Sequence, residues 1–143
     1  MRIREGGWFC GLLVAVTVAG CAKTPVQSPT TGARKAVQRY YEALLSRDWE
    51  QAYSVLDADS KARCTPEQFS RLAPNYRSGI GFEPDAVHVR SCDEKDALAT
   101  AHVIFTGRAA AKEHRYKDAI MLRRGDGGWN VVLPEYFGQA AGR

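Results

Sequence analysis

The sequence predicts an α+β domain in which helices come first and an antiparallel sheet follows. Apolar residues recur every three or four positions up to about residue 73, the spacing of a helix with one buried face. From about residue 87 they recur every second position, the spacing of half-buried strands. The strand-like segments follow one another without intervening helices, which indicates an antiparallel meander and not a parallel sheet.

Three helical segments are expected. The first begins at Ala33 and carries one apolar stripe, formed by Ala33, Val37, Tyr40, Tyr41, Leu44 and Leu45. Asp48 is a candidate N-cap for a second helix, which we expect the polar segment 57–60 to end. Thr65 and Pro66 have the residue types of an N-cap and a first helical position, and Gln68 completes a capping box. We expect Pro74 and Asn75 to end this third helix.

Four strands are expected after the helices. Their inward faces are predicted to be Val87 and Val89, then Ala101, Val103 and Phe105, then Tyr116, Ile120 and Leu122, and finally Trp129, Val131 and Leu133. Residues 107–112 are expected to connect the second and third strands. The glycine-rich segment 125–128 is expected to form the last hairpin turn, which leaves its Arg-Gly-Asp triplet, residues 124–126, with a turn role and no adhesion role.

The N-terminal segment predicts where the protein resides. Arg2 and Arg4 precede an apolar stretch, residues 8–19, that is short for a membrane span. The following Val18-Ala19-Gly20-Cys21 resembles the lipobox of bacterial prolipoproteins. The resemblance implies a signal peptide at residues 1–20 and lipidation of Cys21, whose thiol forms a thioether to diacylglycerol and whose amino group is then open to acylation, with palmitate among the acyl chains. It also implies a lipid anchor in the cell membrane or outer membrane, facing the periplasm or the exterior. The alternatives are a single-pass anchor, or a secretory signal with an incidental cysteine.

Residues 21–32 contain two prolines and no apolar periodicity, so we expect a flexible tether between the lipidated cysteine and the domain. By the same resemblance, Ala22 after the cysteine favours the outer membrane in a two-membrane organism. The domain is predicted to cover residues 33–137, followed by a tail at 138–143.

The charge distribution bears on possible partners, and the cysteine count bears on a possible disulfide. The net charge of +4 is not gathered into blocks, so no nucleic-acid partner is expected. Of the four cysteines, Cys64 and Cys92 remain in the domain, where an exported protein could join them in a disulfide or keep them as buried thiols.

The domain resembles the nuclear transport factor 2-like superfamily, whose fold is similar to that of the cystatins. The likeness rests on three packing signals over residues 33–137: the segment Arg39-Tyr40-Tyr41-Glu42-Ala43-Leu44, then Asp48-Trp49-Glu50-Gln51-Ala52-Tyr53, and the final Trp129-Asn130-Val131. It implies helices packed on a strongly curved four-stranded antiparallel sheet, forming a cone with a pocket between them. The superfamily contains isomerases, dehydratases, polyketide cyclases and binding modules, so the fold alone does not decide function.

No catalytic motif of that superfamily carries over to this chain. The candidate pocket residues are Tyr40, Tyr53, His102 and Asp118, because superfamily enzymes use an Asp or Asp/His pair with Tyr donors. Asp118 is predicted instead to lie on a solvated strand face among basic residues, namely Arg115, Lys117 and Arg123. His88, His102 and His114 lack metal-ligand spacing, so neither a metal nor a cofactor is expected.

The sequence therefore predicts a lipid-anchored envelope protein that binds a partner protein or a small apolar ligand and catalyses no reaction. One alternative is a pocket enzyme of the isomerase, dehydratase or polyketide-cyclase kind. Another is a spacer or homodimerisation module that pairs through its sheet.

Overall fold

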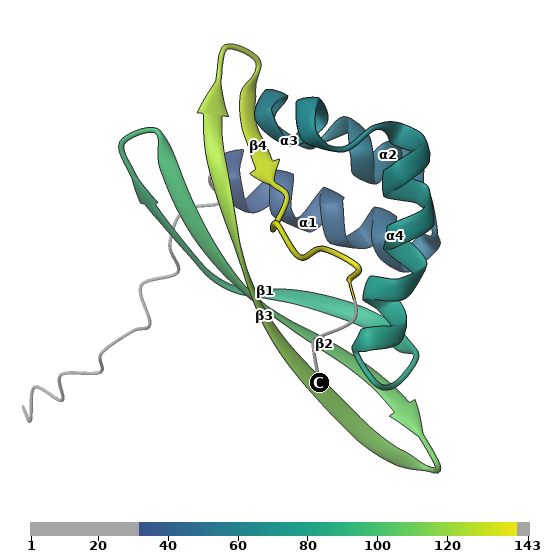
Figure 1. Cartoon of the computed structure of the whole chain (residues 1–143). Coiled ribbons are helices and arrows are strands. Elements are labelled where there is room, and N and C mark those ends of the chain that lie inside the picture. The colour runs from purple at the N-terminus through teal and green to yellow at the C-terminus, as the bar shows by residue number, and fades with distance from the viewer. Residues whose placement is uncertain (1–31, 140–143) are drawn as a thin grey trace, which may run out of the picture.

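The computed structural model describes residues 32–139, which form four helices and one sheet (Figure 1). The helices are α1 (Gly32–Ser46), α2 (Trp49–Ser54), α3 (Ala58–Arg63) and α4 (Pro66–Gly79). The strands are β1 (Pro84–Lys95), β2 (Leu98–Ala109), β3 (Lys112–Gly125) and β4 (Gly128–Val132). All strand pairs are antiparallel in the order β1-β2-β3-β4, so the predicted α+β fold class is confirmed.

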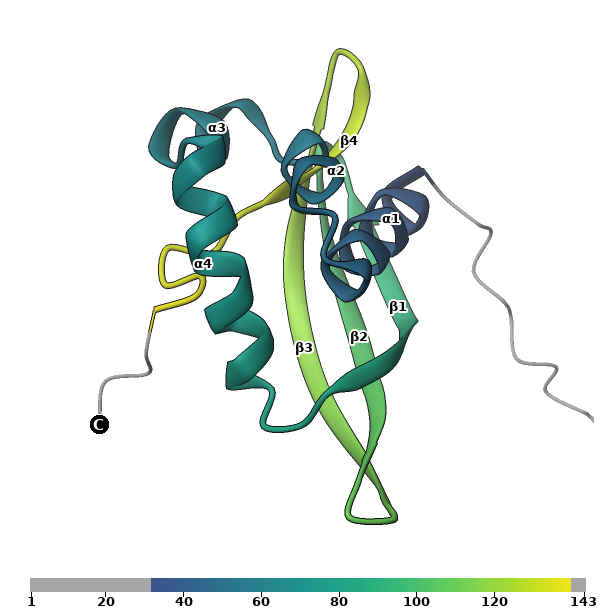
Figure 2. The same ribbon diagram turned by 90° about the vertical axis from the view of Figure 1, so that its right-hand side faces the viewer.

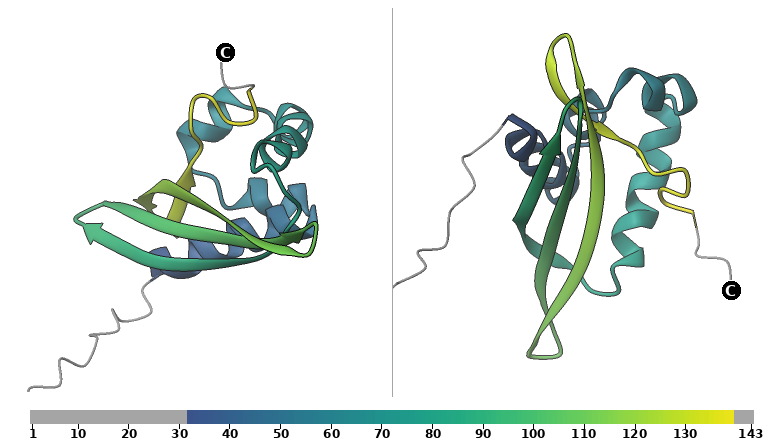
Figure 3. Two further views of the ribbon diagram at one scale, coloured as in Figure 1. Left: turned by 90° about the horizontal axis from the view of Figure 1, so that it is seen from below. Right: turned by 90° about the vertical axis from the view of Figure 1, so that its left-hand side faces the viewer.

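The sheet bends strongly and all four helices lie on its concave side (Figures 2 and 3). Alternation along the strands explains this arrangement. Val103 and Phe105 are buried on the concave face, whereas the neighbouring His102 is exposed on the convex face. The stripe predicted for α1 is largely buried against β1 and β4, and five of its six residues are almost completely covered: Ala33, Val37, Tyr40, Tyr41 and Leu44.

Two predictions about the helices are wrong. The segment 57–60 begins a helix, because the Asp57 side chain accepts a hydrogen bond from the Ser60 backbone N–H at 2.9 Å. The helix that starts at Pro66 does not end at Pro74 but continues to Gly79, although its expected capping box between Thr65 and Gln68 is present.

α4 continues beyond Pro74 because the opposite face of the helix is buried. Pro74 is exposed, so its ring costs the helix a backbone hydrogen bond without disturbing the buried side. Arg77, one turn later, is almost fully buried and donates to the Leu44 carbonyl at 2.8 Å and to Glu83. These bonds satisfy carbonyl groups at the end of α1 and fix the last turn of α4 to it.

The β2–β3 connection is tighter than predicted. Only Ala110 and Ala111 separate the strands, and both have positive φ angles, 49° and 61°. Gly107 lies inside β2, where a Cβ would come within 2.3 Å of the Glu83 carbonyl oxygen. The glycine is therefore required by a close backbone approach and does not mark a loop.

The sequence predicts that Trp129 fills the core, but in the structure its side chain is only half-buried. The Arg124 guanidinium lies 4.6 Å from its ring centroid, and the fully buried residue of β4 is Val131. Trp129 therefore closes one edge of the domain.

Within residues 32–139, no helix combines the length and the apolar character needed to cross a membrane. The predicted signal peptide, Cys21 and nearly all of the predicted tether fall outside the residues that the structure describes.

Candidate functional site

A cluster of tyrosines surrounds Asp118 on the concave face of the sheet. Asp118 pairs with Val103 in the β2–β3 register and therefore faces the helices. Its Oδ2 accepts hydrogen bonds from the Tyr41 hydroxyl of α1 at 2.9 Å and from the Tyr76 hydroxyl of α4 at 2.6 Å. We call Asp118, Tyr40, Tyr41, Tyr76 and Tyr116 the tyrosine–aspartate cluster. Asp118 thus connects β3 to α1 and α4 through hydrogen bonds.

The predicted solvated position of Asp118 is wrong. Lys117 and Ala119, its neighbours on β3, are exposed, whereas Asp118 is half-buried and bonded to the helices. His102 pairs with Ala119 and is exposed on the opposite face of the sheet. The two residues therefore do not line one pocket, as an Asp/His pair would have to.

Burial keeps the tyrosine hydroxyls protonated. It is the main cause that raises the pKa of Tyr41 and of Tyr76 well above the ordinary value, and the Asp118 carboxylate raises both further. Both hydroxyls therefore donate to Asp118 throughout the neutral pH range. The other carboxylate oxygen, Oδ1, accepts from the Ala119 backbone N–H at 2.8 Å. Both oxygens of Asp118 therefore accept hydrogen bonds from groups of the fold itself.

Tyr40 and Tyr53 differ in how their hydroxyls are satisfied. The Tyr40 side chain is fully buried, and its hydroxyl has no hydrogen-bond partner within the described part of the chain. Burial raises its pKa, with smaller contributions from Asp118 and Cys64. Tyr53 is half-buried and donates to the Cys64 carbonyl at 3.0 Å, which fixes the α3–α4 connection to α2.

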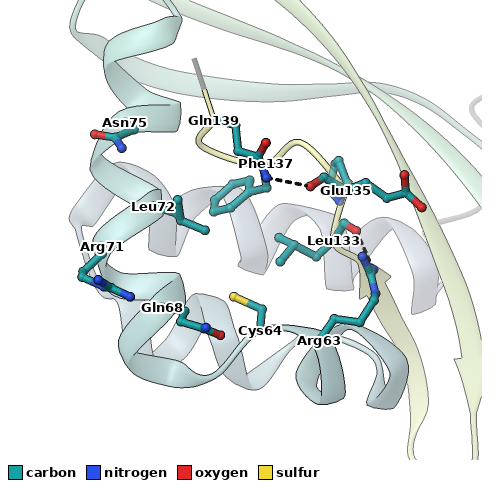
Figure 4. Close-up of a pocket in the computed structure, with 11 residues that line it drawn as sticks. Arg63, Cys64, Gln68, Arg71, Leu72, Asn75, Leu133, Glu135, Phe137 and Gln139 are labelled. Carbon is teal, nitrogen blue, oxygen red and sulfur yellow. Dashed lines mark hydrogen bonds between the residues drawn. The ribbon is translucent and has the colours of Figure 1, made fainter. Parts of the chain in front are cut away.

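An open cleft of about 480 Å³ lies beside this cluster, between α4 and the C-terminal segment (Figure 4). We call it the C-terminal cleft. Its size falls in the range of small-molecule pockets, about 300–1,000 Å³. The lining residues come from the α3–α4 region and from the chain after β4: Arg63, Cys64, Gln68, Arg71, Leu72, Asn75, Leu133, Pro134, Glu135, Phe137 and Gln139.

Phe137 separates the C-terminal cleft from the tyrosine–aspartate cluster. Its ring stacks on Phe69 with centroids 5.2 Å apart and on Tyr76 at 5.1 Å. The next residue, Gly138, has a φ of 63°, and a Cβ there would come within 2.2 Å of the Leu72 carbonyl oxygen. Glycine at this position thus allows the C-terminal segment to approach α4 and places Phe137 over the interior.

Cys64 lines the cleft and is not joined to Cys92, so the candidate disulfide is absent from the structure. Cys64 ends α3, near β4, whereas Cys92 lies on β1 at the other edge of the sheet. Three interstrand spacings, about 14 Å, separate those edges, well beyond the reach of a disulfide. Burial raises the pKa of the Cys64 thiol, an effect that Arg63 partly offsets.

The C-terminal cleft is not among the features that the sequence predicts. The sequence places Leu133 at the end of a strand, Phe137 as the last residue of the domain and Gly138 as the start of a tail. The available signal is Gly138 itself, because a glycine after the last strand marks a turn. Of the α4 residues that line the cleft, Gln68, Arg71 and Leu72 lie within the helix that the sequence predicts, and Asn75 lies at its expected end. Their role as lining residues depends on the C-terminal segment that packs opposite them.

No grouping of metal-ligating side chains occurs among residues 32–139, and the three histidines stand apart on the strands. His114, for example, packs against the Phe82 ring with centroids 5.6 Å apart.

Sequence comparison finds no family profile and no curated protein that matches the chain. Solved structures do match its fold. A Campylobacter jejuni protein named "Putative NTF2-like transpeptidase" is 12% identical, with a TM-score of 0.55 over 71% of this chain and 97% of its own. RPA3114 of Rhodopseudomonas palustris, described as containing a SEC-C motif, is 16% identical, with a TM-score of 0.53 over 72% and 78% of the two chains. At these identities the likeness supports the expected nuclear transport factor 2-like fold and nothing about activity.

Proposed function

We propose that this protein is a lipid-anchored envelope protein whose domain binds a small, largely apolar ligand in the C-terminal cleft and catalyses no reaction. The observation that carries the proposal is the contrast between an open cleft and a neighbouring cluster whose carboxylate is already bonded to the fold. Leu72, Leu133 and Phe137 supply apolar surface to a hollow of about 480 Å³. The tyrosine–aspartate cluster, where related folds would hold a catalytic base, is occupied by its own hydrogen bonds.

The name of the Campylobacter jejuni neighbour makes an enzyme the main alternative. A covalent transfer reaction needs an activated nucleophile beside a general base. In the C-terminal cleft the nucleophilic side chain is Cys64, and burial raises the pKa of its thiol. Ser60 lies nearby in the fold, but its hydroxyl accepts a hydrogen bond from the Leu133 backbone N–H at 2.8 Å and its side chain is fully buried. These features support binding over catalysis.

The ligand proposal is tested by analysing what copurifies with the protein. The full chain is purified from its own membranes, extracted with organic solvent and examined by mass spectrometry. Leu72→Trp should fill the cleft, and Leu98→Trp is the matched control because Leu98 is 45% exposed on a hairpin. A molecule present with the parent and with Leu98→Trp but absent from Leu72→Trp supports the proposal. Identical extracts from all three proteins contradict it.

The anchoring proposal rests on the resemblance of residues 18–21 to a lipobox and has a separate test. Cells fed a palmitate analogue should label the parent protein and leave Cys21→Ala unlabelled, because the thiol is the attachment point. Cys64→Ala controls for cysteine substitution in general. Equal labelling of the parent and of Cys21→Ala would remove the lipid anchor from the proposal.

A further inference from the structure

We propose that the ligand of the C-terminal cleft is an anionic amphiphile, a molecule with a short apolar body and a carboxylate head. This inference rests on the proposed ligand-binding function and adds the chemical class of the ligand. The geometry that points to it is an apolar wall flanked by two guanidinium groups, Arg63 on one side and Arg71 on the other (Figure 4).

The two arginines have donors to spare. Arg63 donates from Nη2 to the Leu133 carbonyl at 3.0 Å, which uses one of the five N–H bonds of its guanidinium. Arg71 makes no hydrogen bond or ion pair with any other described residue. A planar guanidinium binds a carboxylate through two parallel hydrogen bonds, so either side chain offers a complete site for such a head group.

The charge of the cleft also favours an anion. Glu135 contributes the one carboxylate of the lining set, and its side chain points away from the space between Leu72, Leu133 and Phe137 (Figure 4). A cationic ligand would therefore meet two like charges without a facing carboxylate. A neutral ligand would gain apolar contact but would leave both guanidinium groups to water.

The apolar wall sets what the rest of the ligand must be. Leu72 comes from α4, whereas Leu133 and Phe137 come from the segment after β4, so apolar surface is present on both sides of the cleft. The buried Cys64 thiol lies on the same wall, and its raised pKa keeps it neutral. A short alkyl chain buries its carbon atoms there while its head remains at the rim.

Three probes of equal chain length separate the effect of charge from that of apolar contact. Octanoate, octanol and octylamine are added to the full mature chain in phosphatidylcholine vesicles. The readout is the rate at which iodoacetamide alkylates Cys64, measured by mass spectrometry of its peptide, with Cys92 on β1 as the internal control. The melting temperature of the same samples gives a second readout that does not depend on thiol reactivity.

We expect octanoate to protect Cys64 at a concentration about fivefold lower than octanol, as a partly solvated ion pair allows. Octylamine should protect least, and Cys92 should be unaffected by all three. Arg71→Gln should remove most of the preference for octanoate, and Arg63→Gln should reduce it. Arg39→Gln, an exposed arginine of α1 that does not line the cleft, should leave it unchanged.

The outcomes distinguish the two proposals. Equal action of octanoate and octanol on both readouts would overturn the anionic class while leaving an apolar ligand in place. Stronger action of octylamine would also overturn it. If no probe changes alkylation or melting, both the anionic class and the small-ligand function are wrong.

Discussion

The tyrosine–aspartate cluster and the C-terminal cleft share a wall but differ in how far their charged side chains are bonded within the fold. In the cluster, Asp118 accepts bonds from Tyr41, Tyr76 and the Ala119 backbone. In the cleft, the Arg71 guanidinium has no partner within residues 32–139. The comparison teaches that a carboxylate on the concave face of a sheet can be used by the fold itself, so that the side chain with unused donors, Arg71, lies beside the expected pocket and not in it.

The largest expected effect follows from removing the acceptor of the cluster. Asp118→Ala should lower the free energy of unfolding by about 4 kcal/mol, because the hydroxyls of the buried Tyr41 and the half-buried Tyr76 both lose their partner. Urea unfolding followed by circular dichroism measures this change. Asp126→Ala, an exposed carboxylate on the β3–β4 turn, should change stability by less than about 0.5 kcal/mol. Similar small effects of both variants would show that the cluster does not hold the helices to the sheet.

A second change tests the shared wall. Phe137→Ala removes a 5% exposed ring stacked between Phe69 and Tyr76, and should lower the free energy of unfolding by about 3 kcal/mol. It should also speed alkylation of Cys64, because the cleft and the interior become continuous. Tyr136→Ala is the neighbouring control, since that side chain is 77% exposed. An unchanged alkylation rate in Phe137→Ala would mean that this ring does not separate the two regions.

A third prediction concerns pH. Burial raises the pKa values of Tyr40, Tyr41 and Tyr76 in the folded state, so these groups lose protons in the unfolded state first. Their contribution is complete below pH about 10 and declines above it, by up to about 1.4 kcal/mol per pH unit for each tyrosine. Unfolding measured between pH 8 and pH 11 checks this slope, and Tyr76→Phe should make it shallower. A slope identical in the variant would contradict the assignment to Tyr76.

The smallest expected effect on stability is that of a substitution in the C-terminal cleft. Arg71→Gln should change the free energy of unfolding by less than about 0.5 kcal/mol, because the exposed guanidinium bonds to no other described side chain. Thermal melting without ligand measures this. A loss as large as that of Asp118→Ala would mean that Arg71 serves the fold and not a ligand.

Much of the fold follows from local periodicity. The α1 stripe and the inward residues of the strands, such as Val103 and Ile120, are predicted correctly because one buried face imposes a strict repeat. The length of α4 could not be predicted, since Pro74 is tolerated only because distant partners of Arg77 hold the helix beyond it. The position of Asp118 could not be predicted for a related reason. Its basic neighbours on β3 suggested solvent, and only the approach of Tyr41 and Tyr76 from two helices explains a carboxylate on the inner face.

The two walls of the C-terminal cleft differ in how firmly they are attached, and the wall formed by the C-terminal segment can separate from the domain while the α4 wall stays in place. The hydrogen bonds donated by residues 134–139 to described residues stay within the segment, such as Phe137 N–H to Pro134 at 3.1 Å and Gln139 N–H to Tyr136 at 3.0 Å. Leu133, where this wall begins, is bonded to Ser60 and Arg63, and beyond it the wall is attached through the contacts of Phe137 and Gly138. The α4 wall is fixed by Arg77 and Tyr76. Amide hydrogens of this segment should exchange with solvent through local opening, far faster than those of β2 or β3. A molecule bound in the cleft would slow that exchange at the five amides of residues 135–139, since Pro134 has no amide hydrogen, and its binding would then be visible in the dynamics of this segment.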